Sequence, residues 1–275
     1  MLRNGHESTT EEAAAGGSPP LQPPLRPISF LVTVVLFAVP AAIVSFSLLV
    51  VLPALMRKGF SLFAVFNLTF LPPLALMLIA AFVGMKLEGR SLTWPVIRDR
   101  LRLGRLPRHG WWWVLALCVF NVVAGIAAGS ALRRTPTSLH IYTWPKEFAS
   151  FMATFGKTGN EFLGIPLPGH WWVLFYYLVV MIVFNMFGEE LWWRGFILPR
   201  QELGQGRWTW VIHGILWDMF HIFYHQTAWT FIAFLPPMLA IAYVCQRLKN
   251  TWPGIVSHTV ANSAIPIVIL HGILR

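Results

Sequence analysis

The stretch GEELWWRGF, residues 188–196, closes an apolar run that begins at Trp171 and has no charged residue before Glu189. A run of this length and composition predicts a membrane-spanning helix. Each ionised group at the centre of a bilayer costs roughly 2.5–3.5 kcal/mol on insertion scales. Two carboxylates and a guanidinium so close to such a run therefore indicate a functional site inside the membrane.

The spacing of these three charges predicts different roles for the two glutamates. Glu190 and Arg194 are four residues apart, so they share a helix face and can neutralise each other. Glu189 lies about 100° further round a helix of ~3.6 residues per turn and is left without that partner. A carboxylate held in an apolar site can act as a general base. The alternative is a structural ion pair that locks two membrane helices together.

Composition places the chain in the membrane. Of its 275 residues, 56% are hydrophobic and 12% are charged, whereas a soluble domain normally has about 25% charged residues. The net charge of +10 comes mostly from short loops between apolar segments, as the positive-inside rule describes, so nucleic acid is not expected as a partner. Cys118 and Cys245 both lie in apolar runs, which argues against a disulfide framework and a thiolate metal site.

The hydrophobic pattern predicts an all-α polytopic membrane protein, a bundle of about seven transmembrane helices with a buried polar catalytic cavity. The fifth and sixth apolar runs are short and interrupted, and Pro236-Pro237 breaks the sixth. The seven runs cover approximately residues 28–55, 60–85, 111–132, 171–197, 208–224, 229–245 and 252–274.

The segments between these runs predict the orientation of the chain. Residues 1–27 are polar and rich in Pro, Ala and Gly, which indicates a disordered cytoplasmic tail without a signal peptide. Within the N-terminal transmembrane part, 28–170, the segment 86–110 contains six arginines alternating with apolar residues. We expect it to be amphipathic and to lie on an anionic cytoplasmic membrane surface. The N-terminus is then cytoplasmic, the loop 133–170 external, and 171–275 forms the catalytic core.

Polar side chains recur in the last runs, where contact with lipid is unfavourable. Trp217 and His221 are four residues apart, so the ring is expected to stack on the imidazole, and His258 and Asn262 have the same spacing. At ~1.5 Å per residue these side chains and Glu189 lie about 10–20 Å from the cytoplasmic ends of their helices. They can therefore meet at one level. His213, Asp218 and His225 are further polar residues of the fifth run without an assigned role.

Three motifs occur in order on successive predicted helices: Glu189-Glu190-x-x-x-Arg194, Trp217-x-x-x-His221 and His258-x-x-x-Asn262. This set resembles the family of CAAX prenyl proteases and bacteriocin-processing enzymes, which includes Abi-type immunity proteins. The resemblance covers about residue 171 to the C-terminus. One departure is Trp217, where the family usually has Phe.

The resemblance implies an intramembrane endopeptidase. Glu189 and His221 would position and activate a water molecule that attacks a peptide carbonyl. His258 and Asn262 would donate hydrogen bonds to the tetrahedral oxyanion. The other motif residues would support the site: Glu190, Arg194 and, through ring stacking, Trp217.

The resemblance also implies that no cofactor is required. A zinc ion is the alternative, with Glu189, His221 and His258 as its ligands, because two imidazoles and a carboxylate form a common zinc donor set. His221 and His225 have the i, i+4 spacing of helical ligands. The chain has no H-E-x-x-H motif, which favours the metal-free interpretation.

The implied partners are the lipid bilayer and a membrane-associated protein or peptide, cut at a C-terminal tag, a leader or a CAAX-like end. The expected location is a cell membrane, crossed several times and taken to be a prokaryotic inner membrane, and no oligomeric state is indicated. Two other functions stay open: a non-catalytic immunity or scaffold protein of the same fold, and a transporter or proton relay, since intramembrane Glu, His and Arg also mark ion pathways.

Overall fold

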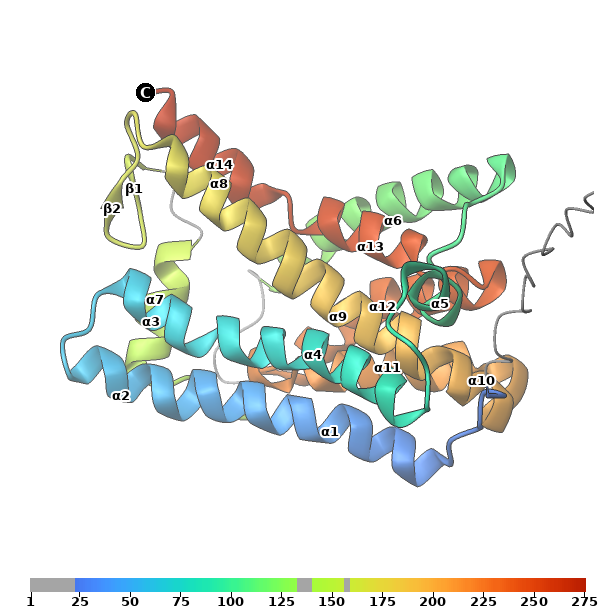
Figure 1. Cartoon of the computed structure of the whole chain (residues 1–275). Helices are drawn as coiled ribbons and strands as arrows, with labels where there is room; N and C mark the ends of the chain where they lie inside the picture. The colour runs from blue at the N-terminus through green and yellow to red at the C-terminus, as the bar shows by residue number, and fades with distance from the viewer. Residues whose placement is uncertain (1–22, 133–139, 156–158) are drawn as a thin grey trace, which may run out of the picture.

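The computed structural model describes residues 23–132, 140–155 and 159–275, and it is mostly helical (Figure 1). Most of the predicted tail, residues 1–22, and residues 133–139 and 156–158 of the predicted external loop lie outside the described residues. The helical prediction is confirmed. One small addition is an antiparallel hairpin of β1 (Glu161–Phe162) and β2 (Ile165–Pro166).

Five helical stretches of the described chain are long and apolar enough to cross a membrane: Phe30–Arg57, Leu62–Leu87, Arg108–Ser130, Trp171–Phe220 and Ala228–Leu248. A sixth results if two helices that meet at an angle of 48°, Trp252–Ala261 and Ala264–Ile273, form one broken span. The chain is therefore a multi-pass membrane protein. The count of about seven spans is not confirmed, because five such stretches, or six with the broken pair, meet the criteria of length and composition.

The first two spans are each built from shorter helices. The first contains α1 (Phe30–Phe46), the wider π-helical turn η1 (Ser47–Val51) and α2 (Leu52–Arg57), and the second contains α3 (Leu62–Thr69) and α4 (Leu71–Leu87). Helix α1 begins at Phe30 because the hydroxyl of Ser29 accepts a hydrogen bond from the Val32 N–H at 3.2 Å, which caps the helix. Helices α1 and α4 run side by side (Figure 1).

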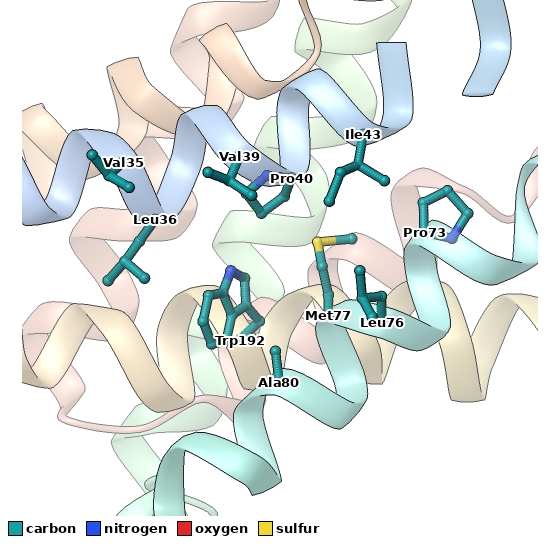
Figure 2. A pocket seen from close by; sticks show the side chains of 10 residues that line it. All are labelled: Val35, Leu36, Val39, Pro40, Ile43, Pro73, Leu76, Met77, Ala80 and Trp192. Atoms are coloured by element: carbon teal, nitrogen blue, oxygen red, sulfur yellow. The ribbon is translucent and has the colours of Figure 1, made fainter. Parts of the chain in front are cut away.

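An apolar cavity of about 260 Å³ lies between α1 and α4 (Figure 2). Val39 and Pro40 line it from α1, Met77 and Ala80 line it from α4, and Trp192 lines it from the helix that carries the two glutamates. None of its lining side chains is charged. This cavity is therefore not the polar catalytic cavity expected from the sequence. The polar catalytic cavity stays a prediction.

The core begins with a long helical rod that crosses the molecule in yellow and orange (Figure 1). It consists of α8 (Trp171–Val179), η3 (Val180–Phe187), α9 (Gly188–Glu190), η4 (Leu191–Ile197) and α10 (Leu198–Gln205), of which η3 and η4 are π-helical. At Gly206, with φ of 69°, the chain reverses through η5 (Gly206–Trp208). Only glycine adopts this backbone conformation without steric cost.

After this turn come α11 (Thr209–Phe220), η6 (Ile222–Tyr224) and α12 (Ala228–Leu248). Helix α12 packs against α11 and against α6 (Arg108–Leu132). The prediction that Pro236-Pro237 interrupts this run is wrong, because α12 is continuous through both prolines. Packing on two neighbouring helices outweighs the loss of two backbone donors. The last helices are α13 (Trp252–Ala261) and α14 (Ala264–Ile273).

The connection between α6 and α8 packs against the loop that follows α11. It contains α7 (Lys146–Phe155) and the β hairpin. The Tyr142 hydroxyl donates to the backbone oxygen of Phe223 at 2.7 Å, and the Trp144 indole N–H donates to the same oxygen at 2.9 Å. The predicted external loop is therefore partly ordered against the core.

Part of the basic segment 86–110 is buried against the core, whereas the sequence predicted that the segment lies on the membrane surface. Its helix α5 (Trp94–Arg100) leads into residues 101–104, and we call residues 88–104 the brace. Arg98 is exposed as expected, but Arg100 is buried. Its guanidinium donates to both carboxylate oxygens of Glu88 at 2.6 and 2.7 Å, and to the backbone oxygens of Gly195 and Phe196 at 3.0 and 3.1 Å. Pairing with Glu88 and these carbonyls explains why Arg100 does not face the membrane surface.

The other end of the brace contacts the start of α13. Thr251 donates through its hydroxyl to the Leu101 carbonyl at 2.7 Å and through its backbone N–H to the Arg102 carbonyl at 2.9 Å. The Trp252 indole donates to the Leu103 carbonyl at 3.2 Å. The brace therefore joins η4 to α13, two elements that carry motif residues.

Candidate active site

The backbone around the two glutamates is wider than an ordinary α-helix. Glu189 and Glu190 lie in α9, a single α-helical turn between the π-helical segments η3 and η4. Such π-helical turns are rare and occur often at functional sites. Gly188 allows close packing here, because a Cβ atom on it would lie 3.0 Å from the Leu74 carbonyl oxygen of α4.

Glu190 links two of the three motifs. Its Oε1 accepts from the Arg194 guanidinium at 3.0 Å and lies 3.0 Å from Nδ1 of His258 on α13. Glu190 and Arg194 are completely buried. The pairing inferred from their spacing is thus present, and it extends to His258. Gly254 of α13 makes room for the carboxylate, since a Cβ atom there would lie 2.2 Å from Glu190 Oε2.

Glu189 is held by two tryptophans rather than by another motif carboxylate or imidazole. Its Oε2 accepts from the Trp217 indole N–H at 3.1 Å and from the Trp193 indole N–H at 3.4 Å. The residue is 4% exposed. Glu189 therefore lacks a cationic partner in these contacts, as its position on the helix indicates, but it does not lack hydrogen bonds.

Trp217 lies at the centre of the motif residues. Its ring faces the Arg194 guanidinium, whose Cζ is 3.5 Å from the ring centroid. Its centroid lies 5.7 Å from that of His221 and 5.4 Å from that of His258. The predicted stacking on His221 is replaced by an edge-to-face contact with an interplanar angle of 69°. Trp217 thus brings residues of all three motifs together.

His221 lies just past the end of α11, and its ring is oriented by the backbone. Its Nδ1 is 2.9 Å from the Trp217 carbonyl oxygen. A carbonyl only accepts hydrogen bonds, so Nδ1 carries the proton and Nε2 of the neutral ring is an acceptor. His225 follows the α11 helix and does not share a helical face with His221. Its Nε2 lies 2.9 Å from the Asp218 carbonyl oxygen and 3.0 Å from Asp218 Oδ1.

The side chain of Asn262 bonds to the backbone of His258 rather than to the side chain of another motif residue. Asn262 lies just after α13, and its side-chain amide donates to the His258 carbonyl oxygen at 3.0 Å. This contact caps the helix end beside His258. The assigned oxyanion role of Asn262 stays a prediction.

Sequence reasoning missed two contributors to the site, Trp193 and Gly254, and gave no role to the Asp218–His225 pair. Trp193 is four residues after Glu189 in the same motif, and this spacing could have identified it. Gly254 and the Asp218–His225 pair depend on how α13 and the loop after α11 pack. His213, also without an assigned role, bonds to Gln201 at 2.5 Å and contacts Phe37 outside this cluster.

The zinc alternative has limited geometric support. In the parts of the chain that the structure describes, no three His, Cys, Asp or Glu side chains are grouped so that they could hold a metal ion. The Trp217 ring contacts each of the suggested ligands, Glu189, His221 and His258. A metal-free mechanism stays a prediction.

A comparison with protein-family models matched residues 170–264 to the type II CAAX prenyl endopeptidase Rce1-like family, a family of proteases. Searches of curated proteins and of solved structures gave no match. The matched segment contains the motif residues described above, and the structure gathers most of them around Trp217. Residues 170–264 of this multi-pass membrane protein thus match the CAAX protease family, and this match supports the resemblance noted from the sequence.

Proposed function

We propose that the protein is an intramembrane endopeptidase that hydrolyses a peptide bond of a membrane-associated protein or peptide precursor, with Glu189 as general base. The observation that carries this proposal is the environment of Glu189. It is a buried carboxylate without a cation in its hydrogen bonds, next to Glu190, whose charge is paired with Arg194. One carboxylate is neutralised and the other is available for proton transfer.

In the proposed reaction Glu189 takes a proton from a water molecule, and the hydroxide formed attacks the carbonyl carbon of the peptide. The C–N bond then breaks, and the proton on Glu189 passes to the leaving amine nitrogen. The sum is the addition of one water across one peptide bond. Nε2 of His221, the acceptor atom of the neutral ring, can orient the same water.

We assign the stabilisation of the oxyanion to His258. Its Nδ1 faces Glu190 Oε1 at 3.0 Å and donates to that carboxylate. With Nδ1 occupied in this way, Nε2 donates to an oxyanion only when the ring is protonated. Asn262, which follows α13, is the second proposed donor.

The substrate is proposed to reach the site from the membrane and the cytoplasmic side. The brace, which is part of the basic segment, contacts η4 and the start of α13. A C-terminal tag, a leader or a CAAX-like end anchored at that surface is the class of substrate that fits this arrangement.

The proposal is tested by Glu189→Gln in purified protein reconstituted into bilayers. Membrane-anchored quenched peptides, with and without a prenylated C-terminus, serve as substrates, and mass spectrometry identifies the cut. Gln retains an oxygen that accepts from both indoles but cannot take a proton, so we expect turnover to fall by roughly 10²–10⁴-fold with an unchanged melting temperature. Cleavage by the variant at the wild-type rate would contradict the role of Glu189.

A further inference from the structure

The hydrogen bonds of Glu189 are unevenly distributed over its two oxygens. Both indole N–H groups donate to Oε2, from Trp217 at 3.1 Å and from Trp193 at 3.4 Å. Oε1 accepts no hydrogen bond from the described residues. Unlike Oε2 of Glu190, it is not among the fully buried side-chain oxygens that lack a partner. The carboxylate therefore has one oxygen held by two N–H groups and one, Oε1, that accepts no hydrogen bond from the described residues.

We propose that Trp193 and Trp217 are positioning residues that clamp Oε2 of Glu189 and make Oε1 the atom that exchanges protons with water. This inference rests on the proposed function. An oxygen that accepts two N–H bonds is disfavoured as a protonation site, because the added proton would compete with both donors. The proton from water then goes to Oε1 and leaves from Oε1 to the departing amine.

Each indole is itself fixed by packing, which is what a positioning role requires. Trp193 is fully buried, and its ring stacks on Phe37 with centroids 4.3 Å apart and an interplanar angle of 10°. Trp217 is covered on one face by the Arg194 guanidinium and contacts the His258 ring with its edge. Neither ring can rotate without breaking these contacts, so the donors remain aimed at Oε2.

The two indole donors come from different helical elements, so the clamp also fixes the position of Glu189 relative to both. Trp193 lies in η4 and Trp217 lies in α11. Glu189 is thus placed relative to both helices at once. The resemblance noted from the sequence has Phe at the position of Trp217. A phenyl ring would keep the contact with Arg194 but has no N–H to donate.

Trp192 offers a matched control. It neighbours Trp193 in the same segment and is also buried, but its indole nitrogen has no hydrogen-bond partner among the described residues. It stacks on Phe196, makes a tilted ring contact with Trp193 and lines the apolar cavity. Trp192→Phe removes an indole N–H and a similar volume from the same helix without touching Glu189.

The experiment compares Trp193→Phe, Trp217→Phe and Trp192→Phe on one cleaved peptide in bilayers. We expect kcat to fall about tenfold for each of the first two variants, with KM unchanged, because proton transfer by a general base depends on orientation. Trp192→Phe is expected to stay within about twofold of wild type, as a residue outside the clamp. Unchanged kcat in both clamp variants, or an equal loss in all three, would overturn the proposal.

A second measurement keeps the clamp testable if no cleavage is found. The indole N–H band in ultraviolet resonance Raman spectra reports hydrogen bonding of tryptophan. We expect Glu189→Leu, which removes the acceptor and retains bulk in an apolar site, to shift part of this band to the unbonded position. Trp192→Phe should leave the bonded component intact. A bonded component unchanged by Glu189→Leu would refute the clamp whatever the activity, whereas a shift in an inactive protein would refute only the peptidase assignment.

Discussion

At the residue scale, the buried ion pair and the proposed base make different demands on the fold. Glu190 and Arg194 are both inaccessible and lie 3.0 Å apart. Removal of one partner leaves an uncompensated buried charge, which costs about 3–5 kcal/mol. We therefore expect Glu190→Ala and Arg194→Ala to lower the melting temperature in detergent strongly, whereas Glu189→Gln does not. Equal melting temperatures for all three variants would show that the structural and catalytic roles have been confused.

The second prediction at this scale concerns the space that Gly254 leaves for the Glu190 carboxylate. A methyl group there would meet Glu190 Oε2 at 2.2 Å, and the bonds to Arg194 and His258 prevent the carboxylate from moving freely. Overpacking of this kind costs about 1–3 kcal/mol. We expect Gly254→Ala to lower both thermal stability and peptidase activity. The control is Gly125→Ala in α6, where a Cβ atom meets nothing within 4 Å; a loss of similar size in the control would contradict the steric explanation.

Contacts between residues of one chain segment could be predicted from the sequence, and contacts between distant segments could not. The spacing of Glu190 and Arg194 was sufficient to predict their ion pair, because both lie on one chain segment. The edge contact between Trp217 and His221 in place of stacking depends on the end of α11 at Phe220, one residue before the histidine. The bond from Trp217 to Glu189 joins residues 28 positions apart, so no local pattern contains it.

At the scale of elements, the brace predicts a pH dependence. Burial raises the pKa of the Glu88 carboxyl, but the hydrogen bond from Arg100 and the charges of Arg100, Arg200 and Arg90 outweigh it and hold this pKa below its usual value. A pKa lower in the folded than in the unfolded protein contributes stability above the unfolded value, and this contribution is lost as the pH falls through the folded value. We expect the melting temperature of wild type to fall more between pH 7 and pH 3 than that of Glu88→Gln.

The matched control for this measurement is Asp99→Asn in α5 of the brace, whose carboxylate is exposed beside Arg98. It should follow the wild-type curve, because exposed pairs contribute little. Parallel curves for wild type and Glu88→Gln would contradict a stabilising role of the ionised carboxylate.

Element boundaries were harder to predict than element types. The apolar runs located the helices, since a helix in lipid must satisfy its backbone internally. The π-helical turns on both sides of α9 could not be predicted, because they arise where the rod packs against α4 and the brace. Continuity through Pro236-Pro237 likewise depends on packing against α6 and α11.

At the scale of the whole molecule, orientation in the membrane stays a prediction that labelling can test. The basic brace is expected on the cytoplasmic side and the connection after α6 on the other side. Ser91 lies in the brace and Ile141 in that connection, and both are exposed. With cysteine introduced at one of these positions in a Cys118→Ser background, an impermeant maleimide added outside intact cells should label Ile141→Cys and spare Ser91→Cys. The reverse pattern would invert the proposed topology.

The contacts between the brace and α13 have a consequence for how much of this fold can be found by sequence comparison. At residues 101–104 the brace offers backbone carbonyl oxygens, to which Asn250, Thr251 and Trp252 donate. A carbonyl is present whatever the side chain, so these bonds by themselves do not require particular residues at the four positions. The bonds therefore leave little imprint on residue identity, and the segment that supplies the carbonyls lies outside the family match, residues 170–264. The matched segment can thus be recognised on its own, although in the fold it is bonded to residues outside the match. The borders of a recognisable family domain need not be the borders of its folding unit.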